Sequence, residues 1–496
     1  MTTTSGKLRT AVSWTLHSRL PWYALLVFLL GFFYWKTLHH GVGFWGDSAI
    51  LQFIGKVLGT PFGTGFPLYV MLNYLFVTLV SKGSLATRVN LLSACFSVAA
   101  IIILFEILIL LKIRRYAAFI TALSFGLTYS MWFYSIIAEV YSLHILFVAT
   151  VIFFLLRWHQ SRRDFDFYAA CAFYALSFGN HPLMILLLPS FAYLVWVTER
   201  SVFWNPKKII IVLGLVLLGL SQYLYVVWRT NDPGTPFLVA DTPSLLSFMG
   251  NPGWAFISEM SFAQVVIQNT PIILSLYWNN FYLLLPLAIY GMFCVKDRQL
   301  NIFLLSILII HTLYLIQFEF REIDSYLLPG FLIVAIYVGF AINRVLELIL
   351  RSPRTAWVAL VIPVLLVGLN FRKVDQSQHT RHAMRVEEIL STVKHDAVIL
   401  ADDYDYAAYF WYYLIGEGYE KDRLYALSLN GGPSGDQIKA YLSGEDTIII
   451  GPQRLNVPRG LRVFAHWRVV DELKAAGLQV NETESRYVYE VTLPDQ

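Results

Sequence analysis

Long apolar runs dominate the first three quarters of the chain, and their lengths predict membrane-spanning helices. A helix rises about 1.5 Å per residue, so about 20 apolar residues cross the hydrocarbon core of a bilayer. The pattern predicts a polytopic α-helical membrane protein with about eleven spans. The runs centre on residues 20–38, 89–111, 116–134, 140–156, 166–180, 182–198, 209–228, 276–295, 300–318, 325–343 and 355–370.

Two shorter patterns follow the first span, and both predict helices outside the membrane. Residues 49–57 read as a short helix that begins after Asp47-Ser48. The run from Pro67 to Val80 is apolar but only about half a spanning length, so it fits a helix lying along the outer surface. We therefore expect a transmembrane domain over residues 1–370, with outer loops at 40–88 and 229–275.

After Asn370 the pattern changes, because charged residues become frequent and the apolar runs shrink to strand length. The expected strands and helices alternate, which predicts a small soluble α/β domain over residues 371–496. The strands are expected at 397–400, 424–427, 447–450 and 487–491, and the helices near 380–394, 404–416 and 433–443.

Composition supports a membrane protein: 57% of the 496 residues are hydrophobic and 16% are aromatic. The net charge of +4 is too small to indicate a nucleic-acid partner, and no basic stripe with interleaved aromatics occurs. Cys95, Cys171 and Cys294 lie in apolar runs without paired spacing, so they predict packing roles rather than a disulfide framework or metal site.

The distribution of basic residues predicts the orientation. Lys and Arg cluster at every second connection between the expected spans, and the alternate connections are nearly free of them. The positive-inside rule then places the N-terminus in the cytoplasm, and Asp47 and the C-terminal domain on the outer side of the cytoplasmic (plasma) membrane. The clusters are Lys7/Arg9/Arg19, Lys112/Arg114/Arg115, Arg157/Arg162/Arg163, Arg200/Lys207/Lys208, Lys296/Arg298 and Arg344/Arg351/Arg354.

On this topology the ionisable residues that are costly in a membrane collect at one face. Such groups tend to face cavities or pathways, so a cluster supplied by separate helices predicts one site at the outer boundary. Its members are Asp47, Glu139, His181, Glu319, Arg321, Glu322 and Asp324.

Each of these residues also has a purely structural interpretation. Asp47 is a good N-cap for the following helix, and Glu139 is favoured at the positive end of a helix dipole. His181 precedes Pro182 and fits a helix cap, whereas His144 fits a hydrogen-bonded packing residue. The segment that carries Arg321 fits a solvated charged turn.

Several common catalytic signatures are missing from the sequence: a Gly-rich phosphate loop, a His-Glu-x-x-His zinc helix and a Gly-x-Ser-x-Gly elbow. No cofactor is predicted with certainty. A divalent cation held by Glu139 remains an alternative, although a single carboxylate with basic neighbours argues against it.

The motifs of residues 40–200 resemble those of a known family. The stretches Gly46–Ser48, Leu58–Pro61, Gly65–Tyr69, Asn90–Ser93, Ala138–His144 and Gly179–His181 resemble the protein O-mannosyltransferase-like family (domain of unknown function 2723, glycosyltransferase family 117). More broadly, an acid in the first outer loop, a surface helix, many spans and an outer soluble domain resemble the C superfamily of glycosyltransferases. Two departures stand out: Phe62-Gly63-Thr64 replaces the family's His-Pro-Pro, and Ile50 stands where the family has Glu.

The resemblance implies an inverting transfer of a sugar, such as mannose, from a polyprenyl-phosphate donor to an acceptor hydroxyl, expected to be a protein Ser or Thr. Asp47 would be the general base, Glu139 would orient the acceptor, and His181 and Arg321 would bind the donor phosphate. Further substrate contacts would come from Ser48, Tyr69, Tyr141, His144 and Asn180.

Two other functions stay open from sequence. A glycosyltransferase acting on a lipid or surface polysaccharide fits the same motifs, because none of them identifies the acceptor. A transporter or flippase of lipid-linked sugars is less favoured, since transporters tend to have internal repeats and polar groups near the membrane midplane. No repeat is visible here.

Overall fold

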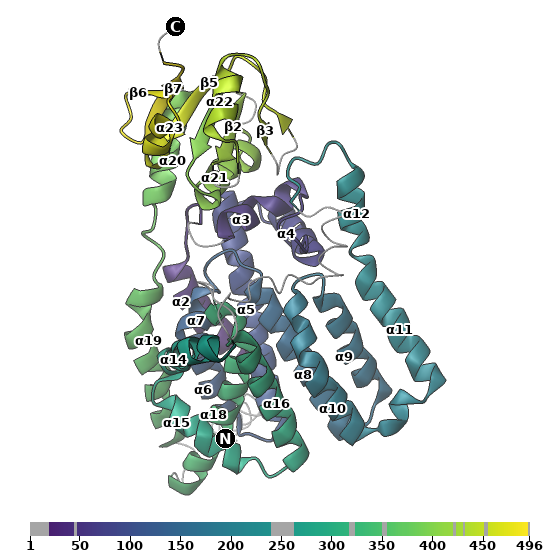
Figure 1. Cartoon of the computed structure of the whole chain (residues 1–496). Helices are drawn as coiled ribbons and strands as arrows, with labels where there is room; N and C mark the ends of the chain where they lie inside the picture. The colour runs from purple at the N-terminus through teal and green to yellow at the C-terminus, as the bar shows by residue number, and fades with distance from the viewer. Residues whose placement is uncertain are drawn as a thin grey trace, which may run out of the picture.

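A computed structural model describes residues 19–43, 47–239, 262–316, 323–349, 355–419, 423–429, 432–450 and 455–494. It has a large helical part and a small α/β domain that is stacked on one end of it (Figure 1). This arrangement confirms the predicted class, a polytopic helical membrane protein with a C-terminal α/β domain.

Six helices in the described parts of the chain are long and apolar enough to cross a bilayer. A seventh span is possible if α14 (Phe262–Phe281) and α15 (Leu284–Cys294), which meet at 90°, are counted as one. The six are α2 (Leu20–Thr37), α5 (Leu85–Leu110), α8 (Tyr141–Ser161), α11 with α12 (Pro206–Ser221 and Leu224–Asn231), α16 (Arg298–Leu315) and α18 (Leu328–Ile349).

The sequence predicts about eleven spans, and the difference lies in runs that fold as shorter helices. Each of these is helical where it is described, but a helix of about 14 residues is only about 21 Å long, less than the hydrocarbon thickness. The breaks fall where a non-helical residue or a proline interrupts the run. The shorter helices are α6 (Arg115–Gly126) with α7 (Tyr129–Phe133), α9 (Asp164–Ser177), η1 (Pro182–Leu187) with α10 (Leu188–Thr198), and η4 (Thr355–Leu360) with α19 (Val361–Val374).

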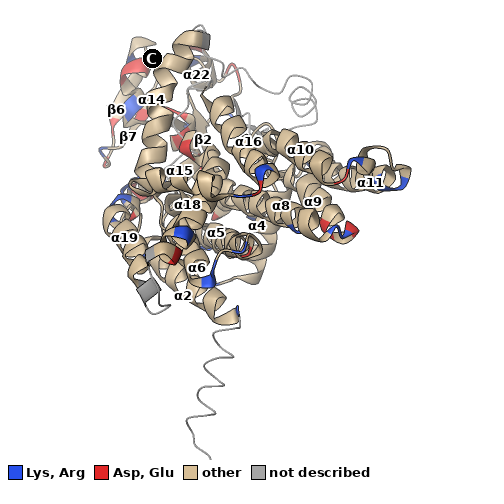
Figure 2. Cartoon of the chain, turned by 90° about the horizontal axis from the view of Figure 1, so that it is seen from below, with Lys and Arg blue, Asp and Glu red and all other residues tan. Residues whose placement is uncertain are grey.

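Charge is distributed as a membrane protein requires. Lys, Arg, Asp and Glu lie at helix ends and in the connections, and the helix sides are largely uncharged (Figure 2). Apolar side chains on the outer face of α11 are exposed, for example Ile210 at 68% and Leu217 at 66%. Surfaces of this kind are stable in lipid rather than water.

The first loop forms the two predicted short helices. The helix α3 (Ser48–Val57) follows Asp47, and α4 (Pro67–Leu79) has 13 residues, too few to cross a bilayer. Both lie at the end of the helical part that carries the C-terminal domain (Figure 1). The predicted second outer loop, 229–275, is largely outside the described residues, and α14 already begins at Phe262.

The C-terminal domain is built on a five-stranded mixed sheet with the order β2-β1-β5-β7-β6. The strand β1 runs parallel to β2 and β5, while β7 runs antiparallel to β5 and β6. The strands are β1 (Ala397–Ala401), β2 (Leu424–Ser428), β5 (Arg462–His466), β6 (Gln479–Glu482) and β7 (Val488–Thr492), with a separate pair β3 (Ile449–Ile450) and β4 (Leu455–Asn456).

The helices of this domain follow the predicted positions. They are α20 (Arg381–Val393), α21 (Tyr404–Trp411) continued by a π-helical turn η5 (Tyr412–Gly416), α22 (Gly435–Leu442), and η7 (Trp467–Val469) with α23 (Val470–Ala475). The predicted helices and strands are confirmed, but the strands β4, β5 and β6 and the helix α23 are missing from the prediction.

The C-terminal domain packs onto the first loop through α21 and η5, which contact α3. The backbone N–H of Ala86, at the start of α5, donates to the Tyr412 hydroxyl at 3.1 Å. The Phe237 ring lies 5.3 Å from the rings of both Phe53 and Trp411. Edge-to-face aromatic contacts of this kind bury large apolar area and fix orientation, so the interface is specific.

Candidate active site

Hydrogen bonds join the segments whose motifs stand apart in the sequence. The Gly43 N–H donates to Gln52 Oε1 at 2.9 Å, and Gln52 Nε2 donates to Asn90 Oδ1 at 3.1 Å. In turn, Asn90 Nδ2 donates to the carbonyl of His39 at 2.7 Å. The first loop, α3 and α5 are therefore held in one arrangement by buried polar side chains.

A second set of bonds joins the remaining motifs. The Glu139 N–H points to Ser93 Oγ at 3.4 Å, and Asn180 Nδ2 donates to the Val140 carbonyl at 3.1 Å. The Leu68 N–H at the start of α4 donates to the Gly179 carbonyl at 2.9 Å. The motifs at Gly65–Tyr69, Asn90–Ser93, Ala138–His144 and Gly179–His181 are thus joined by hydrogen bonds.

Gly179 is required at its position by close packing. A Cβ built there would lie 1.9 Å from Gln222 Oε1. The Gln222 side chain is fixed, since its Nε2 donates to the carbonyls of Leu176 and Gly219 at 3.0 and 2.6 Å. A residue without a side chain lets the turn before His181 pack against α11.

His181 lies at the centre of a group of rings. Its ring is stacked on Phe66 with centroids 6.0 Å apart, and it lies 5.6 Å from Tyr141 and 5.3 Å from His144. Tyr326, from the short helix α17 (Ile323–Tyr326), is 5.6 Å away. Three separate segments therefore surround the imidazole: the residue before α4, the helix α8 and the helix α17.

The predicted capping role of His181 is confirmed, and it fixes the tautomer. Nδ1 accepts the Leu183 N–H at 3.2 Å at the N-terminus of η1. An imidazole nitrogen that accepts carries no proton, so Nε2 is the donor. Burial lowers the pKa of His181 to about 3, so the ring offers one neutral N–H and no positive charge near pH 7.

Glu139 and Tyr69 form a buried polar pair beside these rings. Glu139 is 1% exposed and Tyr69 is fully buried on α4. The pKa of Tyr69 is raised, first by burial and second by the nearby Glu139 carboxylate. Glu139 stands just before α8, where the positive end of the helix dipole favours a carboxylate.

Four of the five predicted substrate-binding residues bury polar atoms that have no hydrogen-bond partner in the described parts of the chain. Such atoms are rare because each costs desolvation energy, and a functional site is one explanation for them. They are Ser48 Oγ, Tyr69 Oη, both ring nitrogens of His144, and Asn180 Oδ1. The structural alternative for His144, a hydrogen-bonded packing residue, is therefore not observed.

Asp47 is partly buried and occupies the N-cap position of α3, but its side chain makes no capping hydrogen bond. The predicted capping interaction is absent. Burial, with a smaller contribution from the charge of Asp405, raises the pKa of Asp47 to about 7. A carboxyl group that titrates near neutral pH can accept a proton from a hydroxyl far more effectively than an ordinary aspartate.

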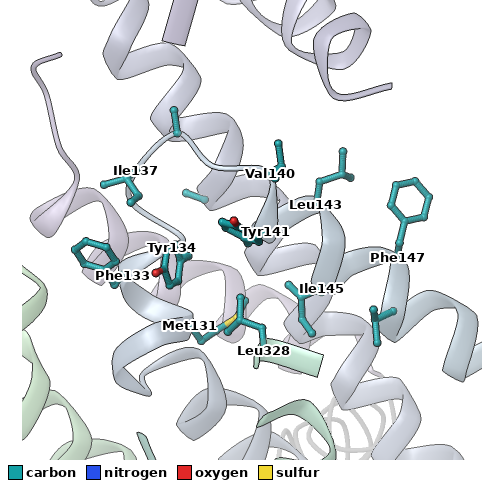
Figure 3. Close-up of a cluster of buried hydrophobic side chains, with 14 of the residues drawn as sticks. Met131, Phe133, Tyr134, Ile137, Val140, Tyr141, Leu143, Ile145, Phe147 and Leu328 are labelled. Atoms are coloured by element: carbon teal, nitrogen blue, oxygen red, sulfur yellow. The ribbon is translucent and has the colours of Figure 1, made fainter. Parts of the chain in front are cut away.

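The last predicted segment of the site is only partly described. Glu319, Arg321 and Glu322 lie outside the described residues. Asp324 is buried and accepts hydrogen bonds from Ser130 Oγ at 2.8 Å and the Tyr134 hydroxyl at 2.9 Å, so it is not part of a solvated turn. Tyr134 and Tyr141 belong to an apolar cluster (Figure 3), with their rings 5.5 Å apart.

Sequence reasoning missed four residues of this region: Phe66, Tyr326, Tyr404 and Asp405. Phe66 stands inside a motif and was a visible candidate, but nothing in the sequence links Tyr326 to His181 or Asp405 to Asp47. Among the residues described, no group of three His, Cys, Asp or Glu side chains is arranged to hold a metal ion.

Sequence comparisons find relatives for the first part of the chain. Residues 47–204 match the family model described as Protein O-mannosyl-transferase TMEM260 N-terminal domain, which confirms the predicted resemblance. The chain is 25% identical over 221 residues to Protein O-mannosyl-transferase tmem260 of Dictyostelium discoideum, covering 41% of this chain and 27% of that protein. It is 29% identical over 189 residues to TMEM260 of Mus musculus, covering 36% and 26%. The match thus spans about a quarter of these relatives.

Structural comparisons cover nearly the whole chain. ArnT from Cupriavidus metallidurans, in the apo state and bound to undecaprenyl phosphate, matches with a TM-score of 0.63 and 12% identity over 95% of this chain and 98% of ArnT. An oligosaccharyltransferase of Archaeoglobus fulgidus matches with a TM-score of 0.50 and 12% identity over 95% and 74%. The predicted glycosyltransferase C architecture is confirmed at the level of the fold.

Proposed function

We propose that this protein transfers a sugar from a polyprenyl-phosphate donor to an acceptor hydroxyl, with inversion at the anomeric carbon. The observation that carries the proposal is Asp47. It is the one acid between residues 20 and 105, it precedes α3 at the end of the helical part that carries the C-terminal domain (Figure 1), and its pKa is raised to about 7. These are the properties that a general base for an alcohol needs.

Asp47 takes the acceptor proton as the hydroxyl oxygen attacks the anomeric carbon. The bond from that carbon to the phosphate oxygen breaks, and the lipid phosphate leaves. Glu139 orients the acceptor through its carboxylate, with Tyr69 beside it. Buried polar atoms of Ser48, His144 and Asn180 supply further hydrogen bonds to the donor sugar or to the acceptor.

The departing phosphate gains negative charge, so its binding group needs donors and a cation. His181 supplies a neutral Nε2–H, with its other nitrogen held by Leu183. Arg321 is proposed as the cation, because a guanidinium binds phosphate oxygens in pairs. A neutral His181 makes that arginine more important, since the histidine itself brings no charge.

The donor and acceptor classes are inferred from the relatives. One ArnT structure contains undecaprenyl phosphate, which supports a polyprenyl-phosphate donor. The relatives named protein O-mannosyl-transferases support mannose as the sugar and a protein Ser or Thr as the acceptor. With the N-terminus in the cytoplasm, the reaction takes place on the extracytoplasmic face of the cytoplasmic membrane.

The test is sugar transfer by purified protein in lipid vesicles with a labelled polyprenyl-phosphate sugar. The variant Asp47→Asn keeps the shape but cannot accept a proton, so transfer is expected to fall by about 10²- to 10⁴-fold. The matched control Asp471→Asn removes one exposed carboxylate from the C-terminal domain and is expected to retain wild-type transfer.

The destination of the label separates the candidates. Label in protein supports the proposed acceptor, whereas label in lipid or glycan indicates a polysaccharide- or lipid-modifying transferase. Unaltered transfer by Asp47→Asn contradicts the role of that residue. Movement of the donor across the membrane by wild-type protein, with no transfer to any acceptor, indicates a flippase.

A further inference from the structure

The first loop supplies a single carboxylate to the site. Asp47 is the only Asp or Glu between residues 20 and 105, and the position one helical turn later is Ile50, which is buried and cannot titrate. Any second acid that acts on Asp47 must therefore come from another part of the chain.

The C-terminal domain brings such an acid to this place. The helix α21 packs on α3, and Asp405 lies in its first turn, while Asp47 is the residue just before the first turn of α3. Tyr404, the first residue of α21, lies within the electrostatic field of both carboxylates, and the pKa of its phenol is raised by burial and by both charges. The helices α3 and α21 lie next to each other at the domain interface (Figure 1), and the charge of Asp405 acts on Asp47 across it.

The interface holds this arrangement in place. The Tyr404 ring lies 5.3 Å from the Trp411 ring on the same helix, and Trp411 lies 5.3 Å from Phe237. At the end of η5, a Cβ added to Gly416 would meet the Cβ of Phe53 at 2.7 Å, so the backbone of the domain approaches α3 closely. Packing of this density leaves the first turn of α21 little freedom to move away.

We propose that Asp405 is a positioning residue for Asp47, so that the C-terminal domain supplies the second acid of the active site across the interface. This inference rests on the proposed function, in which Asp47 is the general base. Asp405 does not contact the reacting atoms in this scheme. It acts through repulsion between the two carboxylates, which together favour one bound proton.

Other charged groups on the elements around α3 are engaged elsewhere. At the start of α21, Asp403 accepts the Tyr406 N–H at 2.8 Å as the helix cap. On α3 itself, Lys56 donates to the Gly416 carbonyl at the opposite end of the helix. On α5, Arg88 donates to the carbonyls of Val77 and Val80. On η5, the Tyr412 hydroxyl donates to Glu417. On α4, Tyr69 interacts with Glu139. On α21, Tyr404 interacts with the carboxylates of Asp47 and Asp405. Both phenols have raised pKa values, so they are neutral at working pH.

The consequence is a pH dependence with a definite sign. The base form of Asp47 is needed for transfer, so wild-type kcat/KM is expected to rise with pH through about 7, the pKa of Asp47. Removing the negative charge of Asp405 relieves the repulsion and lowers the pKa of Asp47. The acid limb of the profile is then expected to move to lower pH by about one unit.

The experiment is the pH profile of kcat/KM for Asp405→Asn in the full-length protein, with Asp405→Glu and Asp436→Asn beside it. Asp405→Glu keeps the negative charge, so the acid limb of its pH profile is expected to match that of the wild type. Asp436→Asn removes a carboxylate whose side chain is 94% exposed on α22 and is expected to leave the limb unchanged. If Asp405→Asn does not yield folded protein, Asp405→Ser provides the same neutral test.

If the acid limb of the pH profile stays in place in folded Asp405→Asn or Asp405→Ser, the proposal is wrong. Loss of transfer at every pH also overturns it, because that result indicates a different role for Asp405. Failure of the proposed function is distinguishable from these results, because it appears as full transfer by Asp47→Asn. A profile that shifts to lower pH in Asp405→Asn and returns in Asp405→Glu supports the proposal.

Discussion

At the scale of single residues, the site is marked by hydrogen-bonding capacity that the fold does not use. Tyr69 is the sharpest case, because its hydroxyl is buried beside Glu139 and Asn73 but makes no hydrogen bond of normal geometry in the described structure. A buried hydroxyl of this kind costs folding free energy, whereas one aimed at a substrate contributes to catalysis. Stability and activity should therefore respond in opposite directions when it is removed.

We predict that Tyr69→Phe leaves the unfolding free energy unchanged or raises it by about 1 kcal/mol, while sugar transfer falls at least about tenfold. Thermal unfolding in detergent and transfer rates in vesicles measure the two effects. Tyr34→Phe is the matched control: Tyr34 is equally buried, but its hydroxyl donates to the Gly126 carbonyl at 2.8 Å. The control should lose about 1 kcal/mol of stability and keep its activity. The reverse pattern in the two variants contradicts a substrate role for Tyr69.

At the scale of elements, the turn between α9 and η1 sets the position of His181. Gly179 precedes it in tight contact with Gln222, at the C-terminal end of α11. We predict that Gly179→Ala destabilises the protein by about 1–3 kcal/mol, because the added methyl group must displace a side chain fixed by two hydrogen bonds. The shift of His181 is expected to reduce transfer at least about tenfold.

The control for this change is Gly214→Ala, inside α11, where an added Cβ would meet no atom within 4 Å. Alanine is a better helix former than glycine, so that variant should be as stable as wild type or gain up to about 1 kcal/mol. Thermal unfolding and the transfer assay test both variants. Equal behaviour of the two alanine variants would contradict the packing argument.

How much of these elements can be predicted depends on their periodicity. The surface helix α4, the strands β1 and β2, and the helices α20 and α22 follow from the lengths of apolar runs and the residues that end them. The strand β5 is missed because Arg462-Val-Phe-Ala-His466 is bounded by charged and ring residues, and its parallel pairing with β1 is a long-range contact. Apolar length alone does not reveal breaks inside a run, such as that between Gly126 and Tyr129.

At the scale of the whole molecule, the site draws on both domains. Asp47, Glu139 and His181 are predictable as candidates because each stands in a motif at the end of an apolar run. The electrostatic effect of Asp405 on Asp47 is not predictable, because 358 residues separate them and only docking of the domain on α3 brings their helices together. Sequence patterns predict helices, strands and their buried sides. Interfaces between domains depend on packing between distant segments, which local patterns do not show.

The orientation of the whole molecule in the membrane gives a last prediction. The basic connections between α10 and α11 and between α15 and α16 lie at the end opposite to the C-terminal domain (Figure 1), so the positive-inside rule places that domain outside. In a background with the three native cysteines replaced, Asp436→Cys should react with a membrane-impermeant maleimide in sealed, right-side-out vesicles. Lys207→Cys should react only after permeabilisation. Labelling of Lys207→Cys in sealed vesicles would indicate the opposite orientation. Asp47 and the donor site would then lie on the cytoplasmic side.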